Sequence, residues 1–178
     1  MIDWYSPDED SYTLADCIKD ENIKCSVILD LGTSTGYIRR YLDKSNIVIS
    51  TDLNMKALLR QKEILPEDAN LIHMDLLSCI RQDLIDFIIF NPPYVLYSDD
   101  PIIGGGLDGR SVIDRFVKEV EIKTFYLLVI EANKYLEIIE NIKERGYNVE
   151  IKKIRRVLRE TIIILKGSKD KNEGKLSL

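Results

Sequence analysis

The sequence predicts an α/β fold with a seven-stranded, doubly wound sheet: five parallel βα units followed by a C-terminal antiparallel hairpin. Two observations support this prediction. Short, β-rich apolar runs alternate with helical patterns, and strands that are apolar throughout are typical of a parallel sheet covered on both faces. The last two apolar runs follow each other without a helical pattern between them, which indicates that they pair as a hairpin.

The predicted elements follow in order along the chain. Five strands are expected within residues 26–32, 46–53, 69–75, 83–91 and 123–133. Asp108-Gly109 is expected to open a helix that places Val112, Ile113, Phe116, Val117 and Val120 on one face. Asn133 is expected to cap a second helix that Gly146 closes, with apolar positions Tyr135, Ile138, Ile139 and Ile142. Residues 147–157 and 158–167 form the predicted hairpin.

Composition limits the class of protein. The 178 residues suffice for one domain, expected over residues 1–166, followed by a polar and flexible tail over residues 167–178. The three cysteines, Cys17, Cys25 and Cys79, are scattered, which predicts reduced, buried thiols rather than disulfides. No apolar run is long enough to span a membrane, and no secretory signal is recognisable. We therefore expect a cytoplasmic protein, with the nucleus as a further location.

Charge and histidine content exclude several kinds of site. The net charge of −5 argues against a non-specific grip on nucleic acid, which requires a basic surface. The single histidine, His73, fits a core or strand-end position, so histidine-based triads and a metal site are not expected. The only dense basic run comprises Lys152, Lys153, Arg155, Arg156 and Arg159. It favours a solvated hairpin face, although contact with RNA or an acidic partner stays open.

The first predicted strand ends in DLGTSTG, Asp30 to Gly36, where glycines let the backbone turn tightly and approach a ligand. A following helix would add its N-terminus to the site. Ser34 and Tyr37 break the dinucleotide-binding pattern GxGxxG, and the lysine of a P-loop is absent. The turn therefore suits a ligand without a pyrophosphate, while a plain strand-to-helix connection remains equally open.

The next two strands also end in acidic residues. Asp52 lies 22 positions after Asp30, a spacing that suits a carboxylate accepting from both ribose hydroxyls, although a helix cap is the alternative. Asp75 ends the third strand and could accept from an adenine amine while Leu76 packs on the ring. Three acids on one rim predict a nucleoside pocket without phosphate clamps.

The fourth strand runs into Asn-Pro-Pro-Tyr, residues 91–94. The Asn91 side chain supplies one carbonyl, and Pro92 supplies a backbone carbonyl on a residue with fixed φ. Two rigid acceptors side by side can hold both hydrogens of an NH2 group, and Tyr94 can stack on the planar group behind it. The motif therefore predicts a clamp for an amide or an amine, with a plain proline turn as the alternative.

These motifs together resemble the class I, S-adenosylmethionine-dependent methyltransferases with a Rossmann-like fold that modify planar nitrogen. WYSPDEDSYTL, Trp4 to Leu14, and GGLDGRSVIDRF, Gly105 to Phe116, are similar to motifs of the HemK-like branch of eukaryotes and archaea. Members of this branch methylate the glutamine amide in the Gly-Gly-Gln motif of the class 1 translation termination factor. They work as heterodimers with a small zinc-binding activator protein.

The resemblance also implies roles for single residues. Those expected to contact S-adenosylmethionine are Ser11, Asp30, Gly32, Asp52, Asp75, Leu76 and Asn91. Those expected to hold the target amide are Asn91, Pro92, Pro93 and Tyr94. Ser34 departs from the family pattern, which has glycine there, so Ser34 must tolerate the turn. The loop from Leu96 to Gly104 is short, which predicts a different substrate rim.

Two other functions remain open at this point. The same clamp fits the amine of adenine, so an N6-adenine methyltransferase acting on DNA or RNA is one alternative, disfavoured by the acidic charge. The other is a scaffold that keeps the fold without catalysis. No direct contact with nucleic acid and none with a membrane is expected.

Overall fold

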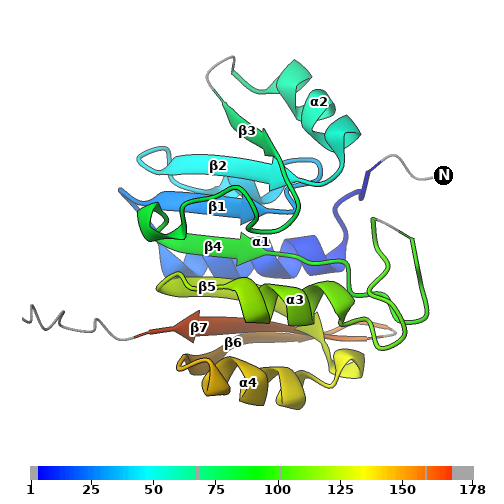
Figure 1. Ribbon diagram of the computed structural model, residues 1–178. Helices are drawn as coiled ribbons and strands as arrows, with labels where there is room; N and C mark the ends of the chain where they lie inside the picture. The colour runs from blue at the N-terminus through cyan, green and yellow to red at the C-terminus, as the bar shows by residue number, and fades with distance from the viewer. Residues whose placement is uncertain (1–3, 67–68, 101, 159, 170–178) are drawn as a thin grey trace, which may run out of the picture.

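The computed structural model describes residues 4–66, 69–100, 102–158 and 160–169. Its centre is a seven-stranded sheet with the strand order β3-β2-β1-β4-β5-β7-β6 (Figure 1). The first five strands are parallel, and the two last ones pair antiparallel. The strands are β1 Val27–Leu31, β2 Ile47–Asp52, β3 Asn70–His73, β4 Phe87–Phe90, β5 Thr124–Ile130, β6 Asn148–Arg156 and β7 Thr161–Ser168. The predicted fold class is confirmed.

Within the described residues, four α-helices flank this sheet, with α3 and α4 on the face nearest the viewer in Figure 1 and α1 on the opposite face. Their bounds are α1 Glu9–Glu21, α2 Met55–Ile64, α3 Ser111–Glu119 and α4 Tyr135–Glu144. The prediction of five complete βα units was wrong for β1 and β3, because no α-helix follows either strand before the next one. A four-residue 3-10 helix, Ile38–Tyr41, follows β1, and the three-residue 3-10 helix Gln82–Leu84 precedes β4. The turn after β1 therefore lacks the long helix that was expected to offer its N-terminus.

Both faces of the sheet are buried, as the apolar strands predicted. In β5, Phe125, Leu127 and Val129 join the core under α3 and α4, while Tyr126, Leu128 and Ile130 join the core that α1 covers. This alternation follows from the two-residue period of a strand. The sheet is thus a rigid middle layer, which holds the ends of its strands in fixed positions.

The C-terminal hairpin folds back so that β7 lies between β5 and β6. The predicted tail boundary was two residues too early, because Gly167 and Ser168 belong to β7 and pair with Phe125 and Thr124. A Cβ on Gly167 would lie only 2.2 Å from Cζ of Phe125, so packing on this ring requires glycine. The rest of the predicted tail, residues 170–178, lies outside the described residues.

Two predicted helix ends need correction. Arg110 rather than Asp108 precedes α3, and Lys134 in the left-handed region, not Asn133, precedes α4. Asn133 is instead the end of a short 3-10 helix and is fully buried. Gly146 has φ +82° just after α4, as a closing glycine should.

The cysteines and the single histidine complete this comparison. All three cysteines are free, but only Cys17 is buried, so the prediction of buried thiols was wrong for Cys25 and Cys79. His73 lies at the exposed end of β3, where Nε2 is 2.9 Å from the carbonyl oxygen of Leu53. In the part of the chain that the structure describes, no helix is long and apolar enough to cross a membrane.

Candidate functional site

A cavity of about 630 Å³ lies at the carboxyl ends of the parallel strands. This is where open α/β sheets bind ligands. Every residue predicted to contact a cofactor or a target amide lines it: Ser11, Asp30, Gly32, Asp52, Asp75, Leu76, Asn91, Pro92, Pro93 and Tyr94. The structure therefore brings all the predicted residues together, while their individual roles remain predictions.

The turn after β1 forms one wall of this cavity. Gly32 and Ser34 both have positive φ, +65° and +45°, so Ser34 adopts a conformation that glycine would take more easily. Two hydrogen bonds hold Ser34 in this conformation. Its Oγ donates to the Tyr5 carbonyl over 2.8 Å, and its backbone N–H donates to Asp52 Oδ2 over 2.8 Å. Ser34 thus ties the turn to the N-terminal segment and to β2.

Asp30 is one of the two deeply buried acids of the cavity, with 3% of its surface exposed. Thr33 Oγ1 donates to its Oδ2 over 2.6 Å. Burial, with the nearby Asp52 carboxylate adding to it, raises the pKa of Asp30 to about 6 although the Thr33 hydrogen bond opposes this shift. A positively charged ligand beside Asp30 would stabilise the ionised form of this buried carboxyl group.

Asp52 and Asp75 occupy the neighbouring strand ends. Asp52 accepts from the backbone N–H groups of Asn54 and Ser34, and burial raises its pKa despite these bonds. The cap of α2 is Asn54, so the cap alternative for Asp52 is not supported. Asp75 forms an ion pair with Arg115 across 2.9 Å, near the cavity mouth where both side chains are about half exposed. A ligand that uses Asp75 must share it with Arg115.

Asn91 lines the cavity, and one polar atom of its side chain lacks a partner among the described residues. Its Nδ2 donates to Asp10 Oδ2 over 2.9 Å, which fixes the orientation of the side-chain amide. Within the described residues, its Oδ1 is buried and has no hydrogen-bond partner. A buried polar atom without a partner is unfavourable unless a ligand satisfies it, so this oxygen marks the position of an expected donor.

Asp10 organises this corner, and the sequence analysis did not identify it. It is 2% exposed, and its Oδ2 also accepts from the Tyr94 hydroxyl over 3.2 Å. Its Oδ1 accepts from the Tyr5 hydroxyl over 2.9 Å and from the Ser11 N–H over 2.6 Å. One signal could have revealed it: Asp10 shares a helical face with Leu14, Cys17 and Ile18, where a charge is out of place.

The tyrosines of this corner are hydrogen-bond donors. Burial, followed by the charge of Asp10, raises the pKa of Tyr94 well above its usual range. The same causes raise the pKa of Tyr5. Both phenols therefore stay protonated at neutral pH, where they donate to Asp10 and cannot act as bases.

The segment after the Asn-Pro-Pro-Tyr motif forms the outer rim. Val95 N–H donates to the Ile103 carbonyl, and Tyr97 N–H donates to the Gly106 carbonyl, so the segment folds on itself. Val95, Ile102 and Ile103 line the cavity, whereas Tyr97 and Leu107 are 80% and 71% exposed. The rim therefore has an apolar inner side and an apolar outer side.

Comparison with known proteins identifies this arrangement. Residues 3–102 match the family described as Methyltransferase small domain. Methyltransferase HEMK2 of Homo sapiens is 27% identical over 94% of this chain and 90% of its own length. A putative protein N5-glutamine methyltransferase of Methanocaldococcus jannaschii is 30% identical, over 90% of this chain and 89% of its own length.

A solved structure is more similar still. It is described as the E. cuniculi Mtq2-Trm112 complex responsible for the methylation of the eRF1 translation termination factor. Its chain is 50% identical, with a TM-score of 0.89 over 95% of this chain and 100% of the matched one. The resemblance drawn from the sequence is confirmed. The family match covers more than half of the 178 residues, and the chain belongs to the methyltransferase small domain family.

Proposed function

We propose that this protein transfers a methyl group from S-adenosylmethionine to the side-chain amide of the glutamine in the Gly-Gly-Gln motif of the class 1 translation termination factor. The observation that carries the proposal is the buried, unsatisfied Oδ1 of Asn91, a residue that lines the strand-end cavity together with Pro92. A primary amide offers the N–H donor that this oxygen lacks. The E. cuniculi complex, described as responsible for methylating eRF1, supports this choice of substrate.

The cavity also fits the cofactor. Asp30 is a buried acid and Asp52 a half-buried acid at adjacent strand ends, suited to the cationic and hydroxyl groups of S-adenosylmethionine, and Leu76 offers an apolar surface for its base. When bound, the cofactor supplies an activated methyl group on a sulfonium. The protein's own task is then to hold the target nitrogen in line with that methyl group.

Positioning is the main catalytic contribution of these residues. An amide nitrogen is a poor nucleophile because its lone pair is delocalised into the carbonyl. Asn91 Oδ1 and the Pro92 carbonyl hold the NH2 group and stabilise positive charge that develops on its nitrogen. Asp10 keeps Oδ1 turned toward the substrate because it occupies the Nδ2 side of the same amide. The methylated nitrogen releases one proton to solvent, because the cavity tyrosines are themselves protonated and cannot accept it.

The proposal is tested by transfer of a labelled methyl group to a purified termination factor, in the presence of the activator protein. Label is expected in the wild-type factor and not in a factor whose Gly-Gly-Gln glutamine is replaced by glutamate. Equal labelling of both factors would contradict the proposed substrate. If calorimetry detects no binding of S-adenosylmethionine, the chain is a scaffold rather than an enzyme.

An acidic pH is expected to weaken cofactor binding. The folded-state pKa of Asp30, about 6, lies above the usual Asp value, so ionising Asp30 destabilises the ligand-free fold as pH rises toward 6. A cationic ligand reverses this penalty, because it favours the ionised form. Affinity should therefore be about tenfold lower at pH 5 than above pH 7.

Calorimetric titration from pH 5 to pH 7.5 checks this expectation. In Asp30→Asn, cofactor binding should be weak at every pH. A smaller dependence of affinity on pH should remain, because burial also raises the pKa of Asp52. Wild-type affinity that stays constant between pH 5 and pH 7 would show that Asp30 does not bind a cationic group of the cofactor.

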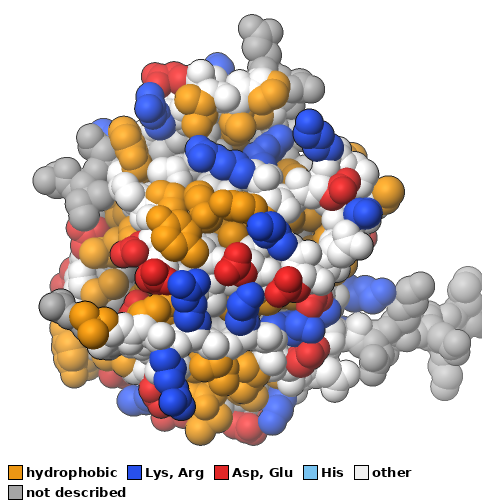
Figure 2. Space-filling view, turned by 180° about the vertical axis from the view of Figure 1, so that it is seen from behind, with side chains coloured by type: hydrophobic (Ala, Val, Ile, Leu, Met, Phe, Trp, Pro, Cys, Tyr) orange, Lys and Arg blue, Asp and Glu red, His pale blue; other side chains and the backbone are white. Residues whose placement is uncertain are grey.

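The basic run of the hairpin does not favour a nucleic-acid substrate. Lys152 pairs with Glu21, Lys153 with Asp20 and Arg155 with Glu9. On the face seen in Figure 2, blue and red side chains are interspersed. Charges neutralised in this way are poor phosphate contacts. Arg159, the last residue of the run, lies outside the described residues.

The proposed partner is a small zinc-binding activator, as Trm112 accompanies Mtq2 in the E. cuniculi complex. β3 is an edge strand of the sheet, and its four residues are exposed or half-buried. On the adjacent α2, Leu59 and Ile64 are exposed apolar residues. An open sheet edge beside exposed apolar side chains is typical of a surface that associates with another chain.

Leu59→Lys is therefore expected to reduce copurification of the activator about tenfold, because a charge would be placed in an apolar contact. Leu84→Lys is the matched control: Leu84 is similarly exposed, 58% against 55% for Leu59, but lies in the 3-10 helix before β4. The control should bind the activator normally. A wild-type chain that is monodisperse and fully active alone would contradict the need for a partner.

A further inference from the structure

Asn133 joins three segments that are distant in the sequence. Its side chain is fully buried, and its Oδ1 accepts from the backbone N–H of Ile130 over 2.9 Å. Its Nδ2 donates to the carbonyl oxygens of Tyr94 over 3.0 Å and of Gly109 over 3.2 Å, with Asp108 at 3.4 Å. The end of β5 is thereby connected to the last residue of the Asn-Pro-Pro-Tyr motif and to the loop before α3.

The three segments pack without spare room. Gly109 has φ +65°, and a Cβ there would lie 2.2 Å from the Tyr94 carbonyl oxygen and 2.4 Å from Asn133 Nδ2. Any side chain at this position would separate Tyr94 from Asn133. The glycine is therefore required so that the backbone of residues 108–109 and the backbone of Tyr94 reach the same amide.

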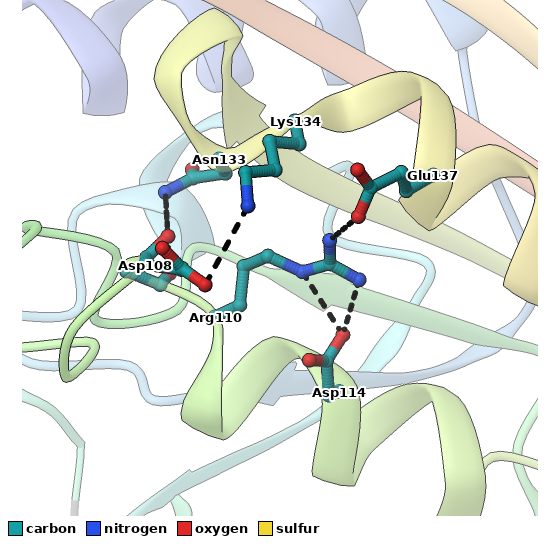
Figure 3. A network of polar contacts seen from close by, with 7 residues as sticks. Asp108, Arg110, Asp114, Asn133, Lys134 and Glu137 are labelled. Carbon is teal, nitrogen blue, oxygen red and sulfur yellow. Dashed lines mark hydrogen bonds and ion pairs between the residues drawn. The ribbon is translucent and has the colours of Figure 1, made fainter.

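Ion pairs hold the surroundings of Asn133 in place (Figure 3). Arg110, largely buried, donates to Asp114 over 3.0 Å and to Glu137 over 2.6 Å, which links the start of α3 to α4. Lys134 lies 3.7 Å from Asp108, and in this view the contact is between Asn133 and Arg110. These cations are paired with carboxylates, and the Asn133 amide is the side-chain donor that the described residues show for the three carbonyl oxygens.

We propose that Asn133 is a positioning residue for methyl transfer: it fixes the backbone of Tyr94 from behind, and through it the clamp formed by residues 91–94. Asn133 does not line the substrate cavity, so its effect is indirect. The inference rests on the proposed function, since it concerns the residues that hold the target amide. The clamp then has two supports. The Asp10 carboxylate holds the side chains of Asn91 and Tyr94, and the Asn133 amide holds the backbone of Tyr94.

The test is Asn133→Asp, which keeps the shape but turns an acceptor oxygen toward the three carbonyl groups. We expect kcat for methyl transfer to fall about tenfold, because small displacements of a positioned group have effects of this order or larger. The affinity for S-adenosylmethionine should change less than kcat and stay within about twofold of wild type, since Asn91 is the one clamp residue that is also predicted to contact the cofactor. A purely structural role would instead lower thermal stability and cofactor affinity together.

Two further variants make the result decisive. Asn141→Asp is the matched control, the same substitution at an exposed position of α4, and should behave as wild type. Asn133→Ser keeps a single donor without the charge and should lie between wild type and Asn133→Asp; it replaces Asn133→Asp if that variant does not fold. Unchanged kcat in both Asn133 variants would overturn the positioning role. A wild-type protein that transfers no methyl group would overturn the proposed function itself.

Discussion

Asn91→Ala is expected to lower kcat for methyl transfer about 10²–10³-fold, the range measured when one fixed polar group is removed from a transition state. The substitution removes Oδ1, the acceptor that is buried and unpartnered in the structure. The Pro92 carbonyl alone would then leave the NH2 group free to rotate. The amide would spend little time with its nitrogen in line with the methyl group.

Single-turnover methylation of the termination factor, with saturating cofactor, measures this effect directly. A cofactor titration of the same variant is the necessary control, because Asn91 is also predicted to contact S-adenosylmethionine. Near-normal turnover together with intact cofactor binding would mean that the amide is held by other groups. The clamp mechanism would then be wrong.

Asp10→Asn is expected to lower activity about 10²-fold with almost no change in volume. An amide has one acceptor oxygen, whereas the carboxylate accepts on both sides from Tyr5, Ser11, Asn91 and Tyr94. If the new NH2 group faces Asn91, the Asn91 amide must turn so that its oxygen faces residue 10. The cavity would then receive the donor Nδ2 in place of the acceptor Oδ1.

Asp8→Asn is the matched control for this variant. Asp8 precedes the same helix, and among the contacts that the described residues show its side chain accepts only from the Glu9 N–H, so an amide oxygen can replace its carboxylate. Methylation by Asp8→Asn should equal that of wild type. If Asp10→Asn were equally active, the orientation of Asn91 would not depend on Asp10.

The sequence allowed prediction of the features that follow from local pattern. Apolar strands ending in Asp30, Asp52 and Asp75 could be recognised one at a time, and a parallel sheet necessarily brings such ends to one edge. The Asn-Pro-Pro-Tyr motif was also recognisable, since it consists of consecutive residues directly after one strand. The fold and the cavity could be predicted from these elements alone.

Features that depend on distant contacts were missed. Asp10 lies 81 positions from Asn91 and 84 from Tyr94, and no local pattern links them. Asn133 looked like a helix cap because it precedes an amphipathic helix, yet its side chain turns inward to segments 24 to 39 residues away. The 3-10 helix after β1 was expected to be a longer helix, because the alternating pattern predicted five βα units.

A crystal structure of the protein with its activator, S-adenosylhomocysteine and a peptide containing Gly-Gly-Gln tests the central claim most directly. The account predicts that the glutamine nitrogen lies within about 3 Å of both Asn91 Oδ1 and the Pro92 carbonyl oxygen, facing the cofactor sulfur. A bound glutamine whose amide points away from Asn91, with Oδ1 satisfied by another group, would contradict it.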